Sequence, residues 1–173
     1  MESKLEKIMK KANNGDAAAL IKLAQAYFKG EVNGYPESGM AMQCLERVAS
    51  HGSPSAQNLC ATLYKDFGMH NKAFEWFMEA AKQNHPESQA LVASYYYAGE
   101  GVDKDEKQAF EWAQKAYKNG ENNVAPTLLG GMYLQGTVVE ADYALAYKMF
   151  CLGAKNGNKL AAQYKNQLED LVK

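Results

Sequence analysis

The sequence has no apolar run long enough to cross a membrane and no excess of either charge. Its 19 Lys+Arg and 20 Asp+Glu residues give a formal net charge of -1 at pH 7. A membrane-spanning helix needs about 18 consecutive apolar residues, and residues 1–11 are too charged for the apolar part of a signal peptide. Nucleic-acid binding requires clustered Lys and Arg, which are also missing. We therefore expect a cytoplasmic protein with no membrane partner and no nucleic-acid partner.

Cysteine is scarce, and its three positions are odd in number and far apart. They are Cys44, Cys60 and Cys151. A secreted disulfide framework needs an even set of cysteines, so we interpret each as a reduced, buried small hydrophobic side chain. The chain of 173 residues is 47% hydrophobic and 23% charged. Such a chain can bury a core without disulfides or metal, and disorder is not expected.

The common catalytic and nucleotide-binding motifs are missing as well. There is no G-x4-G-K-[ST], no G-x-G-x-x-G after a strand, no H-E-x-x-H, no C-x-x-C and no G-x-S-x-G. His51, His70 and His85 fall at expected helix ends or loops, without a second metal ligand four residues away. The acidic cluster at 103–106 lacks the ligand spacing of a calcium loop. The sequence predicts no cofactor, no metal site and no enzymatic activity.

What the sequence does contain is an internal repeat. Four segments share the same order of small, aromatic and turn residues. They are residues 19–52, 56–84, 88–120 and 125–157. The last two align without a gap at an offset of 37 residues, which places Tyr96 on Tyr133 and Gly99 on Gly136. Self-similarity at this period is typical of a solenoid of stacked supersecondary units.

Each unit has the pattern of a helical hairpin. Apolar residues recur at i, i+4, as in Ala19, Leu23 and Tyr27, which is a helix period. Glycine or asparagine, suited to a left-handed helix C-cap, follows each second helix. These residues are Gly52, Asn84, Gly120 and Gly157. We expect an N-terminal capping helix at 1–15, repeats at 16–53, 54–85, 86–121 and 122–158, and a C-terminal capping helix at 159–173.

The order A-x3-L-G-x2-Y-x2-G-x-G-V, then D-x3-A-x2-W-x2-K-A-x3-G, is that of Sel-one-like repeats, which are relatives of the tetratricopeptide repeat. Residues 88–120 resemble it closely, above all at 99–102 and at Trp112. The resemblance extends over about 16–160. It implies an all-α fold, a right-handed superhelix (solenoid) of about ten helices, with the first helix of each hairpin on the concave face.

The resemblance also implies a contact surface. By analogy with tetratricopeptide repeats, partly exposed positions of the first helices line the concave face. The candidate partner-binding residues are Gln25, Phe28, Asn58, Thr62, Lys65, Ser94, Tyr97, Thr127 and Leu134. Aromatic side chains there would supply contact area, and amides and hydroxyls would satisfy a peptide backbone. An equally weighted alternative is that Phe28 and Tyr97 cover neighbouring helices.

Three functions follow from the resemblance. The leading hypothesis is a monomeric scaffold or adaptor that binds a protein or peptide partner on its concave face. The second is an immunity or inhibitor protein that neutralises one toxin or enzyme. The third is a weak hydrolase or β-lactam-binding activity, as linked to cysteine-rich relatives. The single cysteine per unit and the absence of a regular cysteine pair count against the third.

Overall fold

The computed structural model describes residues 3–50 and 52–169, which form ten α-helices and no strand. The helices are α1 (Lys4–Asn13), α2 (Ala17–Lys29), α3 (Ser38–Ser50), α4 (Pro54–Asp66), α5 (His70–Lys82), α6 (Pro86–Ala98), α7 (Glu106–Lys118), α8 (Val124–Gln135), α9 (Tyr143–Lys155) and α10 (Lys159–Leu168). None of these helices is long and apolar enough to span a membrane. The predicted all-α superhelix is confirmed.

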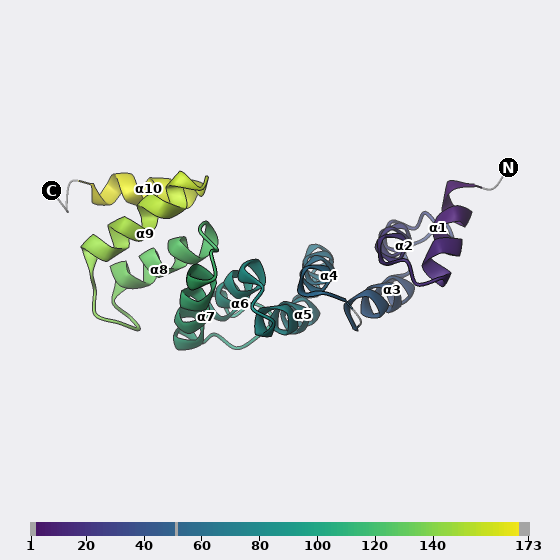
Figure 1. Ribbon diagram of the computed structural model, residues 1–173, viewed down its shortest axis with the longest axis horizontal. Helices are drawn as coiled ribbons and strands as arrows, with labels where there is room; N and C mark the ends of the chain where they lie inside the picture. Colours follow the sequence, from purple (N-terminus) through teal and green to yellow (C-terminus); the bar gives the residue numbers. More distant parts are fainter. Residues whose placement is uncertain (1–2, 51, 170–173) are drawn as a thin grey trace.

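The helices stack in a single row from the N-terminal to the C-terminal end (Figure 1). Four hairpins, α2–α3, α4–α5, α6–α7 and α8–α9, lie between α1 and α10. Each helix packs mainly on its neighbours in sequence, and α8 also contacts the first helices on either side, α6 and α10. The row curves gently, with α2 and α4 above α3 and α5 in the view of Figure 1. Stability in such an array is a sum of nearest-neighbour contacts.

The first helices begin in a common way, which puts them in register. A side chain accepts a hydrogen bond from the amide three residues later, as an N-cap does. The pairs are Asp16–Ala19 (2.7 Å), Ser53–Ala56 (3.4 Å), His85–Ser88 (3.2 Å) and Asn158–Ala161 (3.1 Å). In α8 the Glu121 carboxylate accepts from the amide of Ala125 in their place. Ala19 in α2 and Ser88 in α6 are therefore structurally equivalent.

Helix ends confirm the turn chemistry expected from the sequence. Gly30, Gly99 and Gly136 close α2, α6 and α8 in the left-handed conformation, with φ of 72°, 70° and 67°. After α5, Asn84 takes φ 63° and is the one non-glycine residue of the described chain with positive φ. Asparagine tolerates this conformation better than other side chains. The last residues of α2 and α8, Lys29 and Gln135, are equivalent by the same register.

Alanine makes the close contacts between helices, and a few large side chains fill the wider gaps. Many of the alanines have no exposed surface. These include Ala41, Ala61, Ala73, Ala93, Ala109, Ala113, Ala146 and Ala161. Tyr64, Phe77 and Phe150 are the largest fully buried side chains. Trp112 is half-buried and packs against the core clusters on both sides of it, so it links the two halves of the array.

A buried glutamine ties three helices together in two consecutive repeats. The Gln89 amide nitrogen donates to the Ala81 carbonyl of α5 (3.1 Å), and its oxygen accepts from Asn119 after α7 (2.8 Å). Gln57 makes the same two bonds one repeat earlier, at 3.2 and 2.7 Å. Buried amides are stabilising only when their polar atoms are paired. The sequence signal for this contact is the recurrence of glutamine just after Ala56 and Ser88.

Candidate functional site

The candidate site is the surface of the first helices α2, α4, α6 and α8, where the nine predicted contact residues lie. Seven of them are partly exposed, whereas Asn58 and Thr127 are buried. The partly exposed ones are Gln25, Phe28, Thr62, Lys65, Ser94, Tyr97 and Leu134. The helix register brings Thr62 and Ser94 to the same place on α4 and α6.

Asn58 and Thr127 are engaged within the chain. The Asn58 amide nitrogen donates to a Glu87 carboxylate oxygen (3.2 Å), and its carbonyl oxygen accepts from the Ser88 hydroxyl (2.8 Å), which joins α4 to α6. The Thr127 hydroxyl donates to the Asn123 carbonyl (2.7 Å). Both side chains therefore hold helices in place, and we leave them out of the contact surface proposed below.

Phe28 and Leu134 also pack within the molecule. The Phe28 ring stacks on Phe67, with ring centroids 3.3 Å apart and an interplanar angle of 16°. Leu134 packs against the cluster formed by Ala146 and Phe150 with the C-terminal helix. For Phe28, the structure shows the contact that the alternative interpretation described, because its ring covers a neighbouring repeat.

Tyr97, Thr62 and Ser94 have polar atoms at the surface. The Tyr97 hydroxyl lies 3.4 Å from the Gln135 amide oxygen and 3.3 Å from its nitrogen, in an exposed contact between α6 and α8. The hydroxyls of Thr62 and Ser94 donate to carbonyls one turn earlier in their own helices, at 2.9 and 3.0 Å. Each hydroxyl oxygen can still accept a hydrogen bond from a partner.

One exposed apolar residue of this region was missed by the sequence reasoning. Leu59 of α4 is 44% exposed, which is high for a leucine in a packed helix. It lies beside Cys60, off the buried stripe of Ala56, Cys60 and Tyr64, so the i, i+4 spacing already marks it as facing outward. Apolar area next to hydroxyl groups is the composition of a protein-binding surface.

The titratable groups give no sign of an activated nucleophile. Burial raises the pKa of the Cys60 thiol to about 11 and that of the Tyr95 hydroxyl to about 12. A raised pKa keeps each group protonated and unreactive at neutral pH, whereas a nucleophile requires the opposite shift. Within residues 3–50 and 52–169, no three His, Cys, Asp or Glu side chains are grouped as a metal site.

The predicted histidines lie at helix starts where the structure describes them. His70 is the first residue of α5, and its Nδ1 is 2.8 Å from a Glu100 carboxylate oxygen in the α6–α7 loop. His85 is the N-cap of α6, where its ring nitrogen accepts from the Ser88 amide. His51 lies outside the described residues. Both described histidines therefore have a structural contact at a helix start.

The three thiols should differ sharply in reactivity. Cys60 is fully buried, Cys44 is buried with its pKa raised by desolvation, and Cys151 is half-exposed, so the expected burial holds for two of the three. At about pH 8, we expect Ellman's reagent to titrate Cys151 rapidly and the other two only after unfolding by denaturant. A Cys151→Ser variant should lose the fast phase. Three fast thiols in the native protein would contradict the packing of α3 and α4.

Comparison with known proteins was consistent across family profile, sequence and structure. The Sel1 repeat profile matches residues 17–53, 54–85, 86–121 and 127–158. A protective antigen of uropathogenic Escherichia coli with an SLR fold is 30% identical, with a TM-score of 0.75 over 96% of this chain and 36% of that one. A Sel1 repeat protein from Oxalobacter formigenes is 26% identical, with a TM-score of 0.67 over 88% of this chain and 63% of that one.

A curated fungal relative is much longer. The chitin synthase regulator SKT5 of Saccharomyces cerevisiae is 27% identical over 124 residues, which are 66% of this chain and 17% of the regulator. Sel1 repeat proteins typically mediate protein–protein interactions and are generally non-catalytic. Four matched repeats cover most of the sequence, and the hairpin geometry agrees with them. This chain therefore belongs to the Sel1 repeat family.

Proposed function

We propose that this chain is a non-enzymatic interaction module, a scaffold or adaptor that binds a protein or peptide partner on the surface of its first helices. The observation that carries the proposal is the run of partly exposed hydroxyl, aromatic and apolar side chains on α4 and α6. These are Leu59, Thr62, Lys65, Ser94 and Tyr97. They belong to a repeat family that typically mediates protein–protein contacts.

The chemistry of this surface suits an extended or helical peptide. Tyr97 offers a large, rigid contact area with few rotatable bonds, so little side-chain entropy is lost on binding. Thr62 and Ser94 can accept hydrogen bonds from backbone amides of a peptide. Leu59 supplies apolar area that loses its contact with water when covered. The name of the fungal relative, a regulator of chitin synthase, agrees with a role exerted on another protein.

Site-specific crosslinking tests the proposal. A photoreactive phenylalanine analogue placed at Ser94 should crosslink the partner in a lysate of the source organism. The same analogue at Glu111, exposed on the second helix α7, is the matched control. Mass spectrometry of the crosslinked product identifies the partner. The two labelled proteins should have the same thermal midpoint as the wild type.

The distribution of crosslinks decides the result. A partner crosslinked from position 94 and not from 111 supports binding on the first helices. A partner crosslinked only from 111 would move the contact to the outer helices and contradict the proposed surface. In the supporting case, we expect Tyr97→Ala to weaken binding of that partner by about 1–2 kcal/mol, as for an aromatic contact residue, without a change in thermal stability.

A further inference from the structure

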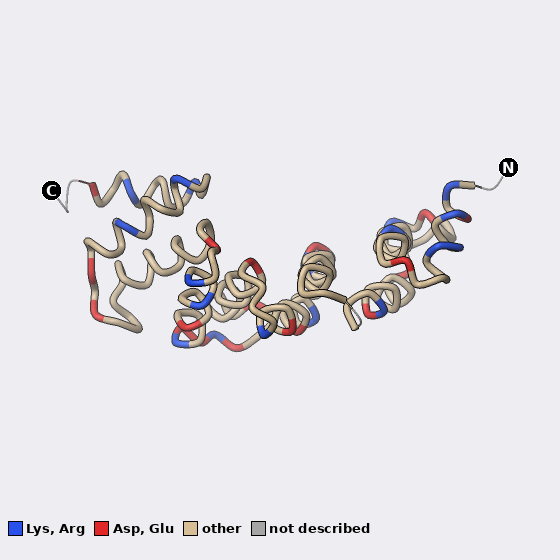
Figure 2. Tube along the Cα trace, viewed as in Figure 1, with Lys and Arg blue, Asp and Glu red and all other residues tan. Residues whose placement is uncertain are grey.

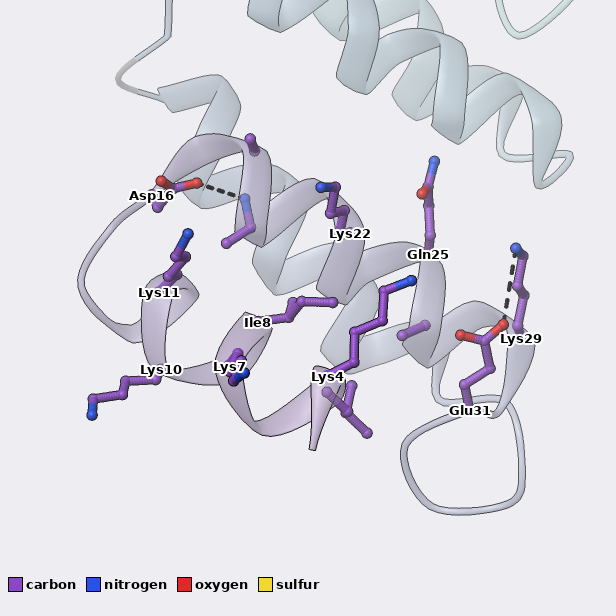
Figure 3. A pocket seen from close by; sticks show the side chains of 14 residues that line it. Lys4, Lys7, Ile8, Lys10, Lys11, Asp16, Lys22, Gln25, Lys29 and Glu31 are labelled. Carbon is purple, nitrogen blue, oxygen red and sulfur yellow. Dashed lines mark hydrogen bonds and ion pairs between the residues drawn. The ribbon is translucent and has the colours of Figure 1, made fainter. Parts of the chain in front are cut away.

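A groove with a volume of about 870 Å³ lies at the N-terminal end, between α1 and α2. In Figure 3, Lys4 and Lys7 lie along α1, Ile8 points from α1 toward α2, and Lys22 and Gln25 lie along α2. Leu5 and Ile8 also pack on the core, so the floor of the groove is apolar. Its rim is charged.

The repeat register explains why the groove exists. In the other repeats, the same side of each first helix is covered by the first helix before it. Ser88 of α6 contacts Asn58 of α4 (2.8 Å), and Gln135 of α8 contacts Tyr97 of α6 (3.3 Å). The residues of α2 equivalent to Ser88 and Gln135 are Ala19 and Lys29.

Ala19 and Lys29 both line the groove. The groove is therefore an open position for one more first helix, shaped by α1 and α2. The filled positions are occupied by helices of 13 residues, α4 and α6. A helix of that length is about 20 Å long, which sets the size of the occupant.

The charge of the groove determines what kind of helix fits. Six lysines and two acidic residues line it. The lysines are Lys4, Lys7, Lys10, Lys11, Lys22 and Lys29. Within the described chain, only Lys29 is within ion-pair distance of a carboxylate, that of Glu31 at 3.9 Å. The other acidic residue, Asp16, accepts the Ala19 amide as a helix cap (2.7 Å). Basic residues on α1 and α2 are visible at this end of the molecule in Figure 2.

Helix-dipole effects account for only part of this pattern. Lys10 and Lys11 lie in the last turn of α1 and Lys29 in the last turn of α2, where positive charge is favourable. Lys4, however, is the first residue of α1, where the dipole disfavours a cation, and Lys22 is in the middle of α2. Their positions are explained instead by a negatively charged neighbour across the groove.

We propose that the α1–α2 groove binds an acidic amphipathic helix of a partner protein, in the position of a preceding first helix. The apolar side of the helix would cover Leu5 and Ile8, and its carboxylates would face Lys4, Lys7 and Lys22. This contact is separate from the surface of α4 and α6 and does not depend on the function proposed above. Partner binding there can fail while this site holds, and the reverse.

A second copy of this chain fits the groove poorly. The unpaired first helix at the opposite end is α10, whose sequence KLAAQYKNQL contains two lysines and no acidic residue. Seating α10 in the groove would bring Lys159 and Lys165 toward the lysines of α1 and α2. Like charges at close range oppose association, so charge complementarity selects a different, acidic partner.

A peptide probe tests the proposal directly. The probe is a fluorescent peptide of about 14 residues with glutamates on one face and leucine and alanine on the other. A side-chain crosslink keeps it helical, because short helices are marginal in water. We expect saturable binding by fluorescence anisotropy, and weaker binding as salt rises from about 0.05 to 0.3 M because added ions screen the charges. The same peptide with lysine in place of glutamate should not bind.

Matched variants of the full chain locate the contact. Lys7→Glu with Lys22→Glu should raise the Kd for the acidic peptide about tenfold or more, from several lost ion pairs and new repulsions. Lys118→Glu with Lys148→Glu makes the same change in net charge on exposed positions of α7 and α9 and should alter the Kd less than about twofold. The thermal midpoints of both variants show that they fold.

Three results would overturn the proposal. The first is no binding of the acidic peptide, and the second is equal weakening by the two double variants, which would indicate unspecific charge attraction. The third is a dimer in sedimentation experiments that disappears in the Lys7, Lys22 variant, since it would assign the groove to a second copy of this chain.

Discussion

Phe77→Ala is expected to lower the free energy of unfolding by about 3–5 kcal/mol, as for a large-to-small change of a fully buried aromatic residue. Phe77 has no exposed surface and meets Tyr95 of α6 edge to face, with ring centroids 5.6 Å apart. Removal of the ring leaves a cavity between the second and third repeats. Aromatic pairing is lost together with the buried apolar area.

The measurement for Phe77→Ala is chemical denaturation followed by circular dichroism, together with amide hydrogen exchange. Because each repeat contacts only its neighbours, exchange should increase most in α5 and α6. Tyr35→Ala is the control, since Tyr35 is 61% exposed in the α2–α3 loop and its loss should change stability by less than about 0.5 kcal/mol. An equal effect of both substitutions would contradict the assigned core.

Gly101→Ala is expected to destabilise by about 3 kcal/mol, which combines left-handed backbone strain with a steric overlap. Gly101 has φ 68°, and a Cβ there would lie 2.5 Å from the backbone carbonyl of His70. Backbone at the start of α5 cannot move away as a flexible side chain could. The substitution should therefore separate the second repeat from the α6–α7 loop.

Gly120→Ala isolates the steric part of this effect. Gly120 also has positive φ, 93°, but a Cβ there would meet no atom within 4 Å. Its substitution should cost only the conformational strain, about 1–2 kcal/mol. Thermal or denaturant unfolding of the two variants gives the difference. Equal losses would mean that the approach of Gly101 to His70 contributes nothing to the stability of the fold.

The helices and their order could be predicted from the sequence because each depends on nearby residues. The i, i+4 spacing of Ala19, Leu23 and Tyr27 identified the buried side of α2, and all three are buried. Asn84 could be identified as a C-cap because few residues other than glycine adopt its backbone conformation. Capping and helix periodicity are local, so no knowledge of the neighbouring repeat is needed.

The candidate surface was less predictable, because exposure depends on the neighbouring repeat. Asn58 has the spacing of a concave-face residue, yet Ser88 and Glu87 of the next repeat engage its amide. Phe28 likewise stacks on Phe67, a residue 39 positions away (67 minus 28). Periodicity shows which side of a helix a residue is on, but not whether another helix covers that side.

The sequence by itself determined that this protein is an array of helical hairpins in a Sel1-type repeat, because helix period, caps and the spacing of the units are written in short segments. Tertiary structure decided which of those residues remain accessible and where charge gathers. Lys4 and Lys22 meet in one groove only because α1 packs beside α2, and Gly101 is constrained only because the α6–α7 loop touches α5. Such contacts depend on packing between units, and no local pattern encodes them.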